Sequence, residues 1–539
     1  MRHSFIAISG TCLAALAAAN LGSGIPAAAD DVHATGDRLG TVNFSISCNA
    51  AAQEGFTRSM ALYHSFAWSQ AMEAFKAVSD ADPKCGMAHW GRAMVMLDNP
   101  FLWPGSLTPE KLGDIASALE DARGAGLHDA REEAYVAALE AFVRDRDTLD
   151  HRARVRLFED AMGEVAAANP EDTEASILHA LITSANFDPT DQTYSNQMRA
   201  AKILEPLFAK HPDHPGVAHY LIHTYDYPPL AEQGLKAASS YAKIAPDATH
   251  ALHMPSHIFT RVGQWQASID SNRESAKVDG GKSLNTHHAY DYKVYAHLQL
   301  AQDGAAREAM NEAFAANKVD HFATAFAYAA MPARVSLERG DWAGAKDLDL
   351  KPATGDYPWE KYPHAEAINA FARGVGAARS GDAKTAKEQQ ARLEKLRDAT
   401  GPDYWVEQVN IQADIVGALA LCAENRAEGC IDALSKAAAR EDATQKHVVT
   451  PGPILPAREI LADILLAHNR AEEALIEYEA VLDKEPNRYR ALAGAIEAAE
   501  KAGNMDKARS HAKHLMEQAA ATDSARSSLE LARRIVSAQ

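Results

Sequence analysis

One spacing of side chains recurs along the chain and constrains its fold more than any other feature. A small residue is followed by apolar or aromatic residues four and seven positions later, and by proline at position twelve. The occurrences are Ala71/Phe75/Val78/Pro83, Ala200/Leu204/Leu207/Pro212 and Ala474/Tyr478/Val481/Pro486. Positions separated by four and seven residues share one helix face, and proline prevents the helix from continuing. The pattern therefore predicts repeated pairs of packed helices.

This spacing, within a helix-turn-helix of about 34 residues, resembles the second helix of a tetratricopeptide repeat. Residues 461–508 are similar to that repeat at nearly every signature position, and residues 75–94 match it well. The Gly-Asp turns at Gly340 and Gly381 are similar to those that separate paired helices. The resemblance implies an all-α, tetratricopeptide-like α-solenoid, a right-handed superhelix of stacked helix hairpins. Alanine-rich helical periodicity dominates the chain, and the signal for strands is poor.

The order of segments predicts five parts. They are a signal peptide at 1–29, an N-terminal extension at 30–50, an N-terminal repeat block with the histidine cluster at 51–346, middle helical repeats at 347–446 and C-terminal repeats at 447–539. The first part combines a short basic start, an apolar run and the small residues Ala27-Ala28-Ala29 before Asp30, which is typical of a cleaved signal peptide. The layout also resembles exported bacterial repeat proteins. We expect a secreted or periplasmic protein.

Charge and cysteine content limit the partners and the compartment. The chain has 54 basic and 73 acidic residues, a net charge of −19, which argues against nucleic acid as a partner. No apolar run reaches the ~20 residues of a membrane span. Past residue 29 the cysteines are Cys48, Cys85, Cys422 and Cys430. Proximity favours pairing Cys48 with Cys85 and Cys422 with Cys430, and buried free thiols are the alternative.

Histidines are concentrated in three successive predicted helices. His219 and His223 stand at i, i+4; His250, His253 and His257 stand at i, i+3 and i+7; and His287 and His288 follow downstream. Such spacings place imidazoles on one face of a helix. Pro255, within the second group, should kink its helix. First helices of stacked repeats line one concave surface, so the three groups should share a pocket.

Two hypotheses follow from this cluster, and mere packing of the histidines is the alternative to both. The first is a scaffold that binds a peptide, protein or small ligand in a pocket formed by Tyr220, His223, His253, His257, Arg261 and Tyr292. The second is a zinc- or copper-dependent enzyme or metal-binding protein with ligands drawn from His219, His223, His250, His253, His257, His287 and His288. Asp226 and Asp291 could then orient ligands through the second ring nitrogen. No P-loop, dinucleotide-binding glycine motif, GxSxG or HExxH sequence is present.

Two irregular joints are expected to matter for the site. Residues 98–107, with the sequence DNPFLWPGSL, should form an ordered insertion that lines the groove. Residues 447–456 contain three prolines and should separate two blocks of repeats.

Overall fold

The computed structural model describes residues 34–352, 357–401 and 403–538, and within these ranges the regular secondary structure is helical. Ala34 and Ala248 form one isolated β-bridge. The described ranges contain no strand. The predicted all-α fold of stacked helix hairpins is therefore confirmed. The signal-peptide prediction for 1–29 lies outside the described residues.

The helices follow one another as hairpins along the chain. The N-terminal ones are α1 (Ala50–His64), α2 (Trp68–Ala81), α3 (Gly86–Met96), η1 (Pro100–Leu102), α4 (Pro109–Ala125), α5 (Ala130–Val143), α6 (His151–Ala168) and α7 (Thr173–Ala185). The central ones are α8 (Ser195–Lys210), α9 (Pro215–Tyr225), η2 (Ala231–Gly234), α10 (Leu235–Ile244), α11 (Thr249–His253), α12 (Pro255–Arg261), α13 (Trp265–Asp279), α14 (Leu284–Gln299) and α15 (Asp303–Ala315).

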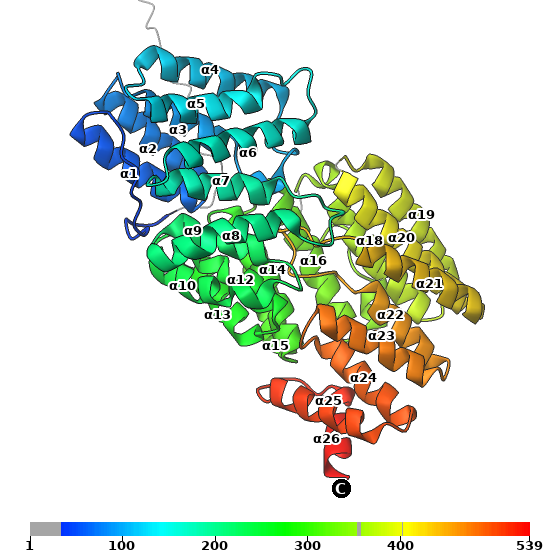
Figure 1. Ribbon diagram of the computed structural model, residues 1–539. Helices are drawn as coiled ribbons and strands as arrows, with labels where there is room; N and C mark the ends of the chain where they lie inside the picture. Colours follow the sequence, from blue (N-terminus) through cyan, green and yellow to red (C-terminus); the bar gives the residue numbers. More distant parts are fainter. Residues whose placement is uncertain (1–33, 353–356, 402, 539) are drawn as a thin grey trace, which may run out of the picture.

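The second half of the chain continues in the same way. Its helices are α16 (Phe322–Leu337), α17 (Trp342–Lys346), η3 (Trp359–Lys361), α18 (Pro363–Arg379), α19 (Ala383–Ala399), α20 (Asp403–Ala423), α21 (Ala427–Asp442), α22 (Ala457–Ala467), α23 (Ala471–Lys484), α24 (Tyr489–Lys501), α25 (Met505–Gln518) and α26 (Ser527–Ser537). In Figure 1 the chain runs from the blue helices at the top, through green, to the red helices at the bottom.

The recurring spacing explains how neighbouring helices pack. Helices α2, α8 and α23 end at Ala81, Lys210 and Lys484, just before the prolines of the pattern. The aromatic rings at the second position lie against glycines of the next helix. A Cβ on Gly91 would lie 2.3 Å from the Phe75 ring, and one on Gly494 would lie 2.2 Å from the Tyr478 ring. Only glycine allows this close approach.

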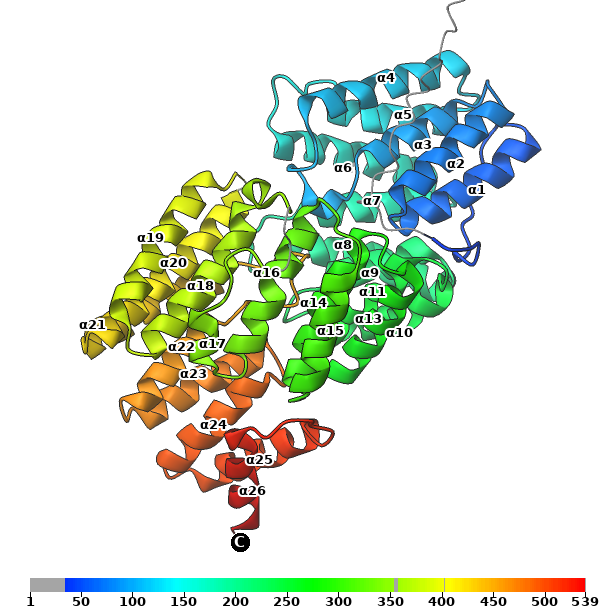
Figure 2. The ribbon, with the colours of Figure 1, turned by 180° about the vertical axis from the view of Figure 1, so that it is seen from behind.

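The superhelix is closed by contacts between its central and C-terminal helices. Trp265 of α13 donates from Nε1 to the backbone oxygen of Asn487, at 2.9 Å. The fully buried Arg488 donates to Glu459, to Glu338 and to the hydroxyl of Tyr295 in α14. The view from behind shows the second-half helices α16–α24 beside the green central helices (Figure 2). Segments more than 200 residues apart, such as Trp265 and Asn487, are thus joined.

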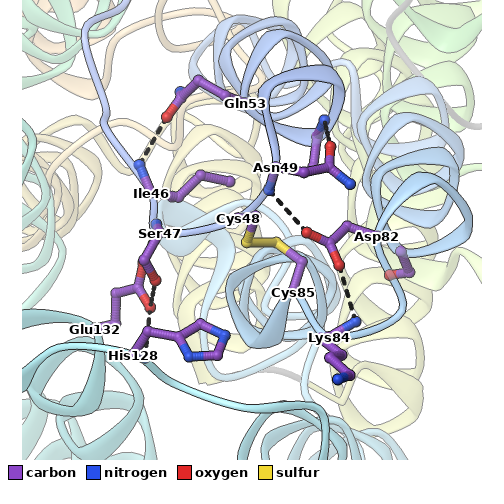
Figure 3. The surroundings of a disulfide bond; sticks show 12 residues. Ile46, Ser47, Cys48, Asn49, Gln53, Asp82, Lys84, Cys85, His128 and Glu132 are labelled. Atoms are coloured by element: carbon purple, nitrogen blue, oxygen red, sulfur yellow. Dashed lines mark hydrogen bonds between the residues drawn. A yellow bond between two sulfur atoms is a disulfide. The ribbon is translucent and has the colours of Figure 1, made fainter.

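Two disulfides fix the hairpins, with the pairing that sequence proximity favours. Cys48 bonds to Cys85 and Cys422 bonds to Cys430. Around the first disulfide, the backbone N–H of Asn49 donates to the carboxylate of Asp82, and the hydroxyl of Ser47 donates to the carboxylate of Glu132 (Figure 3). The disulfide and these hydrogen bonds tie the segment before α1 to the starts of α3 and α5. The predicted boundaries of the five parts remain predictions.

No helix within the described ranges is both long and apolar enough to cross a membrane.

Candidate metal centre

Four helices bring six of the seven predicted metal ligands together. Helix α9, begun by Pro215 at its first turn, is buried along its length and carries His219 and His223. The predicted kink is present, because α11 ends at His253 and α12 starts at Pro255. The kinked pair packs between α9 and α14, which carries His288 (Figures 1 and 2). The histidines of this segment belong to two groups, since His250 of α11 joins one, and His253 of α11 and His257 of α12 join the other.

The first group, here called the first triad, is formed by His219, His223 and His250. One ligating nitrogen from each lies within 4.8 Å of the others. The Nε2 atom of His219 is 3.1 Å from Nε2 of His223 and 3.0 Å from Nε2 of His250. The Nδ1 atom of His219 lies 2.7 Å from the backbone oxygen of His64. A carbonyl can only accept, so Nδ1 carries the proton and Nε2 presents its lone pair to the other two rings.

The second triad is formed by His253, His257 and His288, again with one nitrogen of each within 4.8 Å of the others. The Nδ1 atom of His253 donates to Oδ1 of Asn272 at 2.6 Å. The orientation of that amide is set because its nitrogen donates to the backbone oxygen of Ser268. The Nδ1 atom of His257 donates to the carboxylate of Asp226 at 2.9 Å.

These partners leave two lone pairs facing each other. Because Nδ1 is the protonated nitrogen in both His253 and His257, both Nε2 atoms are acceptors, and they lie 3.1 Å apart. No hydrogen bond can join two acceptors. Two nitrogens bound to one metal at about 2.0–2.1 Å with tetrahedral angles lie about 3.3 Å apart. The observed separation therefore suits a shared cation.

Burial keeps these rings neutral, which is the form that binds metal. It lowers the pKa of His219 to about 3 and lowers the pKa of His223, His250 and His253 well below the usual value. His288 responds in the same way, and burial also lowers the pKa of His257 against the opposing effect of Asp226. A proton is thus a poor candidate for the cation between the rings.

The two triads are neighbours. The ring centroids of His223 and His257, one from each triad, are 6.2 Å apart, and those of His250 and His253 are 6.3 Å apart. Within the first triad the rings of His223 and His250 are themselves 6.4 Å apart. Ions held by the two triads would therefore occupy adjoining sites.

Aromatic side chains wall the triads. Phe101 stacks on His223 with ring centroids 4.0 Å apart, and Phe66 stacks on His250 at 5.4 Å. Tyr292 stacks on His257 at 4.9 Å and donates to the backbone oxygen of Thr450. Phe101 belongs to the predicted insertion at 98–107, which does line the site. Phe66 has a φ of 56°, a strained backbone conformation for a bulky residue.

A network of charged side chains contacts the second triad through the Nδ1 atom of His257. The carboxylate of Asp226, which orients His257, also accepts from Nε of Arg261 at 2.8 Å and from Nζ of Lys446 at 2.7 Å. Although burial opposes it, the charges of Lys446 and Arg261 hold the pKa of Asp226 well below its usual value. Asp226 therefore remains an anion whose charge is already neutralised. Its predicted role as an orienting acceptor agrees with this geometry.

A third buried group, the Glu174 cluster, consists of His64, Glu174 and His214. The Nε2 atoms of His64 and His214 lie 2.9 and 2.7 Å from the two carboxylate oxygens. The Nδ1 atom of His64 lies 2.8 Å from the hydroxyl of Tyr220, and Nδ1 of His214 accepts from the amide of Val217. Every ring nitrogen here has a complementary partner. The cluster also positions the first triad, because His64 supplies the carbonyl that His219 contacts.

Three residues singled out in the sequence lie elsewhere. His287 contacts the hydroxyl of Tyr328 through Nε2 at 3.1 Å, so the structure does not bring it to either triad. Tyr220 belongs to the Glu174 cluster rather than to a pocket between the triads. Asp291 accepts from Arg334 at 3.2 Å and orients no histidine. In each case the side chain leaves its helix on the face that packs against another hairpin.

The predicted ligand-pocket residues are mostly interior. His223, His253, His257 and Tyr292 are buried in the triads and their walls. Arg261 lines a cavity of about 80 Å³ together with Lys446, Thr450 and Tyr404. The cavity thus borders the charged network around Asp226, because Arg261 and Lys446 belong to both.

Three residues that position the histidines could not be identified from the sequence. Asn272, Lys446 and Glu174 are single polar residues in ordinary helical or loop contexts. They reach the site from positions between 19 and 220 residues away from their partners. Nothing in the local pattern around them predicts these contacts.

Comparisons with known proteins match one C-terminal segment and give distant likenesses to helical structures. Residues 456–536 match the family described as TT21 fifth ARM repeats domain. Among solved structures, the chain is similar to the human IFIT1 dimer with PPP-AAAA, at 12% identity, 88% of this chain, 92% of that one and a TM-score of 0.37. It is also similar to the APC/C hetero-tetramer Cut9-Hcn1, at 11% identity, 90% of both chains and a TM-score of 0.32. No curated protein matches the chain. The ARM-repeat match concerns residues 456–536 alone, and the helical-repeat architecture of the whole chain rests on its own helix hairpins.

Proposed function

We propose that this helical-repeat chain is a metal-binding protein, in which the two triads hold two neighbouring transition-metal ions, zinc or copper. Three neutral imidazoles per ion are an established ligand set, which leaves one position for water or substrate. The observation that carries the proposal is the 3.1 Å contact between the lone pairs of His253 and His257. A metal ion between them would make that contact favourable, and burial disfavours a proton in the same place.

We also propose that the protein is exported. The apolar N-terminal segment and the two disulfides both support this, because disulfides persist in oxidising compartments. Cell fractionation should place the protein outside the cytoplasm. Recovery in the cytoplasm with residues 1–29 intact would refute export and leave the metal proposal standing.

A second candidate function, the binding of a small ligand, is supported by the cavity beside Arg261 and Lys446. The helical-repeat scaffold is equally compatible with a peptide or protein partner. A ligand in that cavity would lie next to the carboxylate that orients His257.

Metal analysis of protein produced without a histidine tag tests the main proposal. We expect about two zinc or copper ions per chain after loading and dialysis. The adjacent residues His287 and His288 offer a matched pair of variants on one helix. His288→Ala should lose about one ion, and His287→Ala should keep both. Absence of bound metal in the folded wild type, or two retained ions in His288→Ala, would refute the proposal. Far-ultraviolet circular dichroism checks folding.

A further inference from the structure

We infer that the two triads bind copper as a pair and that the pair binds dioxygen between the two ions. The inference rests on the proposed metal site and adds the metal and the ligand. Three features carry it: the ligand set, the charge around it and the walls of the site.

The ligand set is neutral. Among the described residues, each triad consists of imidazoles alone, whereas the Glu174 cluster includes a carboxylate. Asp226 accepts from Nδ1 of His257, and its single charge is more than balanced by Arg261 and Lys446. In the part of the chain that the structure describes, no carboxylate joins either triad, so none is placed to bridge two ions. Neutral imidazole binds copper as it binds zinc, so the charge that the site tolerates decides between the two metals.

Charge favours the monovalent state. The cost of burying an ion rises steeply with its charge, and five of the six rings of the triads are buried, whereas His288 is partly exposed. Two divalent ions would bring four positive charges among neutral rings, beside Arg261 and Lys446. Two Cu(I) ions would bring two. A dianion placed between two Cu(II) ions restores the same total of two.

The binding step balances on that basis. Each Cu(I) gives one electron, and dioxygen accepts two and stays between the ions as O₂²⁻. No proton is taken up, and no bond to the protein forms or breaks. Release of dioxygen returns both electrons to the copper ions.

The walls suit a small apolar gas. Phe101 and Phe66 cover His223 and His250 of the first triad, and Tyr292 covers His257 of the second. Phe66 has a left-handed backbone conformation, with a φ of 56°. Its ring centroid also lies 4.4 Å from that of His219. Strain of this kind persists where the surrounding structure fixes it, commonly at functional sites.

The test uses anaerobic loading of the full chain with two equivalents of Cu(I), followed by exposure to dioxygen. We expect uptake of one O₂ for every two copper ions and a new near-ultraviolet absorption band. Both should reverse on removal of the gas. His287→Ala should behave like the wild type. His288→Ala, with the first triad intact, should keep about one copper and lose at least tenfold in dioxygen uptake.

The outcomes separate the two levels of the proposal. Failure to retain any metal would refute the metal site itself. Two bound copper ions without dioxygen uptake, preferential loading with zinc from an equimolar mixture, or release of the reduced oxygen as free peroxide would refute the inference alone. Uptake by His288→Ala equal to that of the wild type would also refute it, because one copper cannot supply both electrons.

Discussion

The Glu174 cluster and the second triad contain similar side chains at similar depth, yet they differ in one respect. In the Glu174 cluster, two N–H groups meet two carboxylate oxygens, so protons alone satisfy every atom. In the second triad, Asn272 and Asp226 take the N–H groups of His253 and His257, which leaves two lone pairs in contact. A cluster of histidines therefore indicates a metal only when its hydrogen bonds are incomplete without one.

The largest expected effect on stability comes from removing the metal, because only the triads should depend on it. A chelator should lower the free energy of unfolding of the loaded protein by roughly 4 kcal/mol for each site that was filled at a thousand times its Kd. Thermal unfolding with and without chelator measures this. An unchanged melting temperature in a protein shown to be loaded would mean that the triads resemble the Glu174 cluster after all.

Glu174→Gln should have the next largest effect, independent of metal. The NH₂ group of the new glutamine side chain would face an N–H group of His64 or His214. Two donors cannot hydrogen-bond to each other, so one contact would be lost. The loss should be about 1–3 kcal/mol. Urea unfolding should give the same loss for loaded and metal-free protein. A loss that added metal restores would show that Glu174 is itself a ligand. Glu171→Gln, at an exposed site in the same region, is a suitable control.

Asn272→Ala should reveal the role of the second ring nitrogen. Loss of the acceptor for Nδ1 of His253 should let the ring change tautomer or rotate, which lowers metal affinity about 10- to 100-fold. Competition with a chromophoric chelator measures the affinity of each site. Only the ion of the second triad should bind more weakly. The first triad should be unaffected, because His219 keeps its contact with His64. Equal loss at both sites would argue against two distinct triads.

Acidity should have the smallest effect. Although burial opposes it, His214 and His64 hold the pKa of the Glu174 carboxyl below its ordinary value. A carboxyl whose pKa is lowered on folding stabilises the protein above about pH 4.5, and this contribution is lost as the pH falls. In metal-free protein, the gap in unfolding free energy between wild type and Glu174→Gln should therefore narrow from pH 6 to pH 4. A constant gap would contradict this explanation.

The sequence predicted the fold better than the site. Helix ends before Pro83, Pro212 and Pro486 follow from local steric rules, and so does the kink at Pro255. The i, i+4 pair His219/His223 was also predictable, because helical geometry alone sets it. His253 and His257 remain together although a break separates their helices. The assignment of His250 to the first triad depends on how far the kink turns α11. Long-range packing decides that angle.

The remaining errors have the same physical origin. His287 and His288 are neighbours on α14 and therefore point about 100° apart, so only one can face the triads. Sequence alone does not say which. Likewise, Lys446 reaches Asp226 only because the superhelix closes and brings Lys446 to the end of α9. Closure depends on the summed curvature of all the hairpins, which no local pattern encodes.

The short stretch from His250 to His257 supplies ligands to both triads across a single break at Met254. An ion caught by His219, His223 and His250 would immobilise this stretch and so prepare His253 and His257 for a second ion. Occupancy should then be cooperative, with singly filled molecules rare. The backbone itself, rather than any bridging group, would carry the coupling.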